Sequence, residues 1–251
     1  MPRPNRVTPF GEIVAIPERG TMMGNRGRLH DAEGRIRRPW QVRRWLICVL
    51  DFRGRHREVM APDRYTELFF LDEATGLAAG HRPCFECRRG RFLAFRDAWA
   101  AAELQDHRAE PIKAAAIDDR LHVERVGPGR SKRTFTTNVD DLPDGVLVTL
   151  AGQPDEAMLI WEGGLLSWSL GGYTRRRPRP TGERVAVLTP RSTVAAIRAG
   201  YQPEVHPTAA GPGGNEGEVL PLPVRVIGGH RRPRTQLAPT EMRRTEVIDE
   251  P

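Results

Sequence analysis

The feature that most constrains this chain is a pair of cysteines, Cys84 and Cys87, placed just before a stretch of helical periodicity. Two cysteines separated by two residues can turn both sulfurs toward one centre, as in half of a tetrahedral zinc site. Phe92, Phe95 and Trp99 share one face of the helix predicted after the pair. Redox dithiols usually open a helix straight after a strand, whereas a helix and His-Arg-Pro precede this pair, so zinc is favoured over redox chemistry or buried free thiols.

The residues leading into the pair carry a family resemblance. Residues 69–87 comprise Phe-Phe, an alanine-bearing segment that ends at Gly80, and the run His-Arg-Pro-Cys-Phe-Glu-Cys. This run resembles the C-terminal segment of the Ada-type metal-binding domain of bacterial DNA alkylation-response proteins. The resemblance implies a zinc ion held by cysteines, Cys84 and Cys87 among them, and a role in DNA repair or its regulation. In that family an upstream cysteine also removes a methyl group from a DNA phosphotriester.

The chain departs from the family upstream of the pair. The loop at residues 24–31, where the family brings two further cysteines, contains none. A zinc ion therefore needs two other ligands, and the candidates are His30, Cys48, His56 and His81. We favour Cys48 and His30, while a buried apolar role for Cys48 and a solvated role for His30 stay open. His81 is too close in sequence to Cys84 to ligate easily, although it can hydrogen-bond a sulfur.

The positive charge is concentrated in the first part of the chain. The net charge is +7, and residues 1–100 hold 19 Lys and Arg against 12 Asp and Glu, whereas the remaining residues hold 20 of each. A basic, arginine-rich segment is what a nucleic-acid-binding module would show, because the guanidinium fork binds phosphate through two hydrogen bonds. We therefore expect DNA or another nucleic acid as the partner, with an affinity that falls steeply with salt. The arginines expected to contact phosphate are Arg26, Arg28, Arg53, Arg55, Arg57, Arg82, Arg88 and Arg89.

Two other classes of function stay open. In an enzyme, zinc or a thiolate of low pKa would act on nucleic acid or a small molecule, with Cys48 as nucleophile or with Asp31 or Glu86 as general base. In an interaction protein, aromatic residues of the second half, such as Trp161 and Trp168, would bind a peptide or ligand. The sequence contains no phosphate loop, dinucleotide fingerprint or Ser-His-Asp arrangement.

The patterning predicts an α+β fold. We expect an Ada-like metal-binding module at 5–105, a β-rich domain at 106–206, and a mobile Pro/Gly-rich tail at 207–251. Residues 19–31 predict a loop and residues 45–60 two successive strands, while Gly163-Gly164 predicts the turn of a hairpin over 157–170. No apolar stretch resembles a membrane helix or a signal peptide, which predicts a cytoplasmic protein with no membrane partner.

Overall fold

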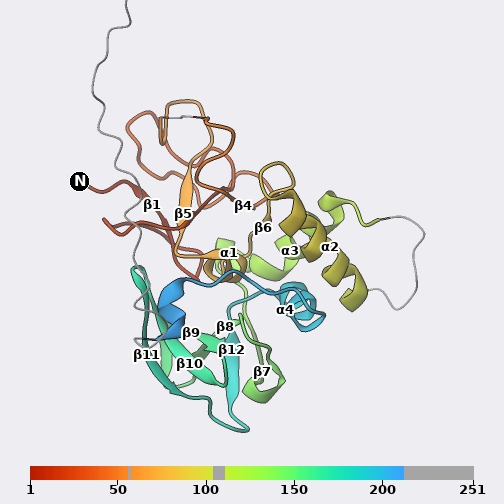
Figure 1. The fold of residues 1–251 in the computed structure, drawn as a ribbon. Helices are drawn as coiled ribbons and strands as arrows, with labels where there is room; N and C mark the ends of the chain where they lie inside the picture. Colours follow the sequence, from red (N-terminus) through yellow and green to blue (C-terminus); the bar gives the residue numbers. More distant parts are fainter. Residues whose placement is uncertain (56–57, 104–110, 212–251) are drawn as a thin grey trace, which may run out of the picture. The chain divides into compact units, whose positions relative to one another are not determined.

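The fold is mixed α and β, and the described residues form two six-stranded sheets (Figure 1). The structure, a computed structural model, describes residues 1–55, 58–103 and 111–211. In spatial order the strands of the first sheet are β2 (Ile13–Ala15), β1 (Pro4–Val7), β5 (Leu68–Phe70), β3 (Met22–Asn25), β4 (Leu46–Cys48) and β6 (Arg82–Pro83). Those of the second sheet are β11 (Gly172–Pro178), β10 (Gly164–Ser169), β9 (Gln153–Trp161), β8 (Leu147–Leu150), β12 (Arg184–Val187) and β7 (Phe135–Asn138).

Four α-helices accompany the sheets in the residues that the structure describes. They are α1 (Glu73–Ala78), α2 (Arg89–Glu103), α3 (Ala114–Arg125) and α4 (Arg191–Arg198). Asp72 caps α1, accepting a hydrogen bond from the Thr75 N–H at 2.8 Å. None of the helices in the described part of the chain combines the length and apolar character needed to cross a bilayer.

The first sheet differs from the sequence-based prediction at its centre. Residues 22–25, expected within a loop, form strand β3 between β5 and β4. A Cβ atom at Gly24 would lie 2.0 Å from the Leu46 carbonyl oxygen and 2.6 Å from the Phe70 ring. Gly24, which had suggested a loop, therefore allows the neighbouring strand and the Phe70 ring to pack against the backbone of β3. Of the two strands expected over 45–60, only β4 forms in the described residues, and it pairs with β3 and β6.

In the second half the expected hairpin is present, with its turn one residue earlier. Strands β9 and β10 pair antiparallel, with Trp161 opposite Gly164. The two turn residues are Glu162 and Gly163, with φ angles of 48° and 73°. Positive φ at both positions is the geometry of a type I′ turn, whose twist matches that of the flanking strands.

Residues on both sides of position 105 belong to one compact unit and share a core. One hydrophobic cluster joins Phe70, Phe95 and Ile117 to Val148 and Val194.

Buried polar contacts at the start of α1 reinforce this connection. The Tyr173 hydroxyl donates to Asp72 at 2.8 Å, and the Tyr201 hydroxyl donates to Glu73 at 2.6 Å. The expected mobile tail lies outside the described residues from 212 onward. Its beginning, Pro207–Ala210, is a 3₁₀ turn that buries Ala209.

Candidate metal centre

The three cysteines of the chain converge on one point of the first sheet. Cys48 ends β4 and Cys84 follows β6, and these strands pair in parallel with Ile47 opposite Pro83. Cys87 lies in the turn before α2, and the three sulfurs are within 4.8 Å of one another. Zinc–sulfur bonds of about 2.3 Å in a tetrahedron place sulfurs about 3.8 Å apart, so a small contraction would suit a metal ion.

Backbone hydrogen bonds hold the cysteines in this arrangement. The Cys84 N–H donates to the Ile47 carbonyl at 2.9 Å, and the Arg88 N–H donates to the Cys84 carbonyl at 3.1 Å. The N–H groups of Glu86 and Cys87 donate to the Cys84 sulfur. Donors aimed at a sulfur stabilise its thiolate form, which is the form that ligates a metal.

The proximity of the thiols changes their acidity. Hydrogen bonds from Cys48 and Cys87 lower the pKa of the Cys84 thiol. The hydrogen bonds of the Cys48 thiol with Cys84 and Cys87, together with its burial, raise the pKa of Cys48 far above its usual value. All three thiols are free of disulfides, and a set of three soft sulfur donors suits zinc, copper(I) or an iron–sulfur cluster.

His30, predicted as a ligand, does not join the cysteines. Its Nδ1 hydrogen-bonds the Thr66 hydroxyl at 2.6 Å and its Nε2 the Ala61 carbonyl at 3.2 Å, so both ring nitrogens are engaged elsewhere. The alternative His81 is fully buried, and its Nε2 accepts from the Arg26 guanidinium at 3.1 Å. His56 lies outside the described residues. Of the four favoured ligands the structure therefore brings together Cys48, Cys84 and Cys87.

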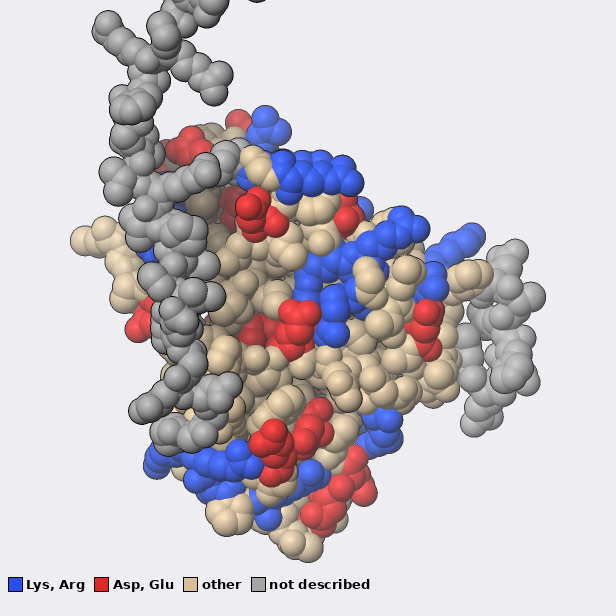
Figure 2. Space-filling view, in the orientation of Figure 1, with Lys and Arg blue, Asp and Glu red and all other residues tan. Residues whose placement is uncertain are grey.

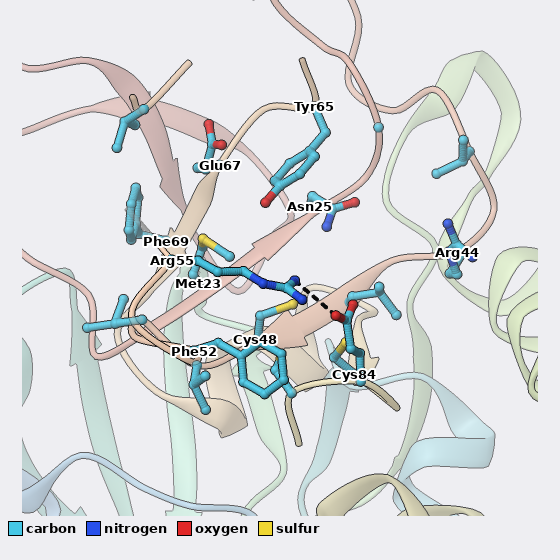
Figure 3. Close-up of a pocket in the computed structure, with 18 residues that line it drawn as sticks. Met23, Asn25, Arg44, Cys48, Phe52, Arg55, Tyr65, Glu67, Phe69 and Cys84 are labelled. Carbon is cyan, nitrogen blue, oxygen red and sulfur yellow. Dashed lines mark hydrogen bonds and ion pairs between the residues drawn. The ribbon is translucent and has the colours of Figure 1, made fainter. Parts of the chain in front are cut away.

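The cysteines lie at the side of a pocket of about 540 Å³ (Figure 3). Most of its lining is apolar, including Met23, Phe52 and Phe69. In the close-up the Arg55 side chain crosses the pocket above Cys48 and pairs with the Glu86 carboxylate at 2.9 Å. Both partners of this ion pair are substantially exposed, so it is weak and can open without a large cost.

Polar groups on the pocket wall were missed by the sequence analysis. Asn25, Arg44, Tyr65 and Glu67 line the pocket together with the cysteines. Glu67 is almost fully buried, and one of its oxygens accepts from the Met60 N–H at 2.7 Å. These residues come from three separate segments of the chain, around positions 25, 44 and 65–67, so no single motif could have identified them.

The eight arginines predicted to bind phosphate do not form one surface. Arg26, Arg82 and Arg88 are buried, and the latter two pair with Asp118 and Glu73 at 2.7 Å. They cannot reach a nucleic acid in this fold, because their guanidinium groups lie inside the protein.

The other five have different positions. Arg28 pairs with Asp63 at 2.6 Å, Arg55 contributes to the pocket, and Arg53 and Arg89 stack on Phe52 and Phe85. Arg57 lies outside the described residues. On the face shown in Figure 2 basic and acidic side chains are interspersed rather than gathered in one continuous basic patch.

No protein-family model, curated protein or solved structure matches this chain.

Proposed function

We propose that this chain is a zinc enzyme in which Cys48, Cys84 and Cys87 hold the ion and the adjoining pocket admits a small substrate to it. The observation that carries the proposal is the number and position of the sulfurs: three converge within 4.8 Å, and all three cysteines line the pocket. Structural zinc sites are closed by four protein ligands, whereas catalytic sites use three and leave one position for substrate. Within the described residues, no fourth His, Cys, Asp or Glu joins this group.

The pocket has the character of a small-molecule site. A volume of about 540 Å³ falls within the range of ligand pockets, which are mostly apolar with a few polar groups that fix orientation. Phe52 and Phe69 would bury the apolar part of a substrate, and Arg44 and Arg55 would favour an anionic or electron-rich one. A bound zinc ion would supply Lewis-acid polarisation of a substrate oxygen or nitrogen.

A second candidate function is binding of nucleic acid at the exposed surface beside the cysteine pair. It is favoured by Phe85, which lies between the two cysteines of the pair, is 45% exposed and carries the Arg89 guanidinium 4.6 Å from its ring centre. Exposed aromatic and arginine side chains side by side suit stacking of an unpaired base and contact with its phosphate. With the charge excess of residues 1–100, this supports a nucleic-acid component as the substrate.

The experiment that tests the proposal is metal analysis followed by cobalt substitution of the full chain under reducing conditions. We expect about one zinc per chain, and a cobalt(II) form whose thiolate-to-metal and d–d absorption bands change when azide or a small thiol is added. Such a change shows a position open to ligands. Absence of zinc, or a cobalt spectrum that no small ligand alters, would overturn the proposal.

The nucleic-acid alternative has its own measurement. Binding of a short single-stranded oligonucleotide would be followed at several salt concentrations for the native chain and for Arg89→Ala. Affinity that falls with salt and with this substitution would favour a nucleic-acid substrate. Equal and negligible binding by both proteins would leave a small molecule as the substrate.

A further inference from the structure

A second cavity, which contains none of the cysteines, is lined by four cationic side chains, the exposed Arg130 and three that are less exposed. Its volume is about 40 Å³, and its lining includes Arg26, Arg125 and Lys132. These residues come from three different segments: the residue after β3, the end of α3, and the segment before β7. Arg26 and Arg125 are 1% and 2% exposed, so their charges lie inside the protein.

The contacts that hold these cations are with neutral groups. Lys132 Nζ donates to the Ala78 carbonyl at 2.6 Å, and Arg125 Nη1 donates to the Gly80 carbonyl at 2.7 Å. Arg26 Nη1 donates to the Gly11 carbonyl at 2.9 Å, while its Nε donates to His81. Backbone carbonyls satisfy hydrogen bonds but do not neutralise charge.

Asp118, the carboxylate whose charge acts on Arg125, is already engaged. Both of its oxygens accept from the Arg82 guanidinium, at 2.8 Å and 2.7 Å. In the described part of the chain, the buried Nη2 of Arg26 and Nε of Arg125 have no hydrogen-bond partner. A buried donor without a partner is costly, and on a charged group it is more so.

The pKa values of the three cationic side chains are lowered by their burial and, for Lys132, by repulsion between them. Burial lowers the pKa of Arg26 to about 9 and that of Arg125 to about 9. Burial of the Lys132 ammonium group, together with repulsion from Arg26 and Arg125, lowers its pKa to about 7. Burial, together with repulsion from the same two arginines, holds the pKa of His81 well below its usual value, so the imidazole adds no charge.

The aromatic walls fix the guanidinium groups in place. The Arg125 and Arg26 guanidinium carbons lie 4.0 Å and 4.3 Å from the centre of the Trp45 ring. Trp40 lines the same cavity, and the exposed Arg130 stacks on its ring at 5.6 Å. The donors are thus preorganised, which reduces the entropy lost when a ligand binds.

We propose that this cavity is a binding site for a compact oxyanion, a phosphate- or sulfate-sized group held by Arg26, Arg125 and Lys132. One water needs roughly 10–15 Å³ of such space, so the cavity holds a few waters or one tetrahedral oxyanion. Arginine forks and a lysine ammonium are the groups that proteins use to bind phosphate. The bound anion would accept from the two unpartnered guanidinium nitrogens and neutralise the repulsion among the cations. Its source is either a free inorganic ion or a phosphoryl group whose organic part lies outside the cavity.

The chain offers a direct probe, because Lys113 and Lys132 are its only lysines. Full-length protein labelled with ¹³C at lysine Cε gives two NMR signals, and the exposed Lys113 serves as an internal control. We expect sulfate, compared with chloride at equal ionic strength, to shift the Lys132 signal saturably and to raise its pKa, with no change at Lys113. A Lys132 signal that responds to chloride and sulfate alike would overturn the proposal.

A substitution tests the same site independently. Lys132→Met keeps the length of the side chain and removes its charge, and we expect sulfate affinity measured by calorimetry to fall about tenfold or more. Lys113→Met is the matched control and should bind sulfate as the native chain does. Because sulfate keeps its charge near neutral pH, native affinity should decrease as pH rises through about 7 and Lys132 loses its proton. Equal affinities of the two variants would contradict the assignment.

Two further ligands distinguish the source of the anion. Inorganic phosphate and a phosphate monoester such as phenyl phosphate would be titrated against the native chain. Equal affinity indicates a free-ion site, and tighter binding of the monoester indicates a phosphoryl group on an organic molecule. Failure of both to bind would overturn the proposal, whatever metal the cysteines hold.

Discussion

Two regions of the molecule each gather side chains of one kind, but the charges that they gather are opposite. One is the pocket beside Cys48, Cys84 and Cys87, here called the thiol pocket, and the other is the cavity lined by Arg26, Arg125 and Lys132, here called the cationic cavity. The first gathers three sulfurs that become negative when they ligate, and the second gathers three cations whose contacts are mostly carbonyl oxygens. In both, like groups repel one another, and in both the pKa values move in the direction that reduces charge at some members. A cluster of like charges inside a protein persists when an ion of the opposite sign binds it. The two regions thus predict a bound cation at one and a bound anion at the other.

Removing a sulfur should have the largest effect. Cys84→Ser takes away the thiol whose thiolate is the most stabilised, and we expect zinc content to fall from about one per chain to near zero. The free energy of unfolding should fall by about 4 kcal/mol, the stabilisation given by a ligand at about a thousand times its Kd. Elemental mass spectrometry and urea unfolding measure the two quantities.

His30→Ala is the control for that change. The side chain is buried and bonded to Thr66 and Ala61, so the variant should lose stability while keeping its zinc. Loss of zinc in His30→Ala would show that His30 is a fourth ligand of the ion, beside the three cysteines.

The next effect concerns the carboxylate beside the cationic cavity. Asp118→Asn leaves the buried Arg82 guanidinium without a counter-ion, next to cations that already repel one another. We expect a loss of about 3 kcal/mol in the free energy of unfolding, measured by urea unfolding. The adjacent Asp119 pairs with Arg43 in an exposed position, so Asp119→Asn should change stability by about 0–1 kcal/mol. Equal losses from the two substitutions would show that Asp118 does not compensate a buried charge.

The two regions also differ in how far the sequence could predict them. The cysteine pair has a fixed spacing that implies shared ligation, and the short apolar run around Cys48 placed it in a strand. The parallel pairing of β4 with β6 then brought Cys48 beside Cys84, which no local pattern states. The cationic cavity has no such signal, because Arg26 and Lys132 are more than 100 residues apart and resemble surface residues in sequence.

Burial of charged side chains explains why several of the arginines predicted to bind phosphate do not lie on the surface. A sequence rich in arginine suggested a phosphate-binding surface, whereas Arg82 and Arg88 are neutralised inside the fold by Asp118 and Glu73. Elements defined by local rules, such as helix α2 after the cysteine pair and the hairpin of β9 and β10, were predicted correctly. Strand β3 was missed because its glycine fits a tertiary contact, the close approach of Phe70 and the Leu46 carbonyl.

Removing the lysine of the cationic cavity should stabilise the protein. The folded state holds the pKa of Lys132 at about 7, below its unfolded value, so the unfolded chain binds more protons between pH 7 and about 10. Native stability should therefore rise with pH across this window, and the cost of burying the charge is fully present below pH 7. Lys132→Met should gain about 1–4 kcal/mol near pH 6 without added anion, and this gain should shrink toward pH 10. Thermal unfolding at several pH values, with Lys113→Met beside it, measures the difference, and a gain independent of pH would contradict the assignment.

The smallest expected effect lies at the mouth of the thiol pocket. Arg55 and Glu86 are 44% and 62% exposed, and a pair so exposed contributes little to folding. Arg55→Gln should change the free energy of unfolding by less than about 1 kcal/mol and leave zinc content unchanged. Its guanidinium nevertheless lies across the pocket above Cys48, so its removal should alter the affinity of azide for the cobalt-substituted protein. Unchanged azide affinity together with unchanged stability would show that the pair does not control access to the sulfurs, and the open position would then be reached from another side of the pocket.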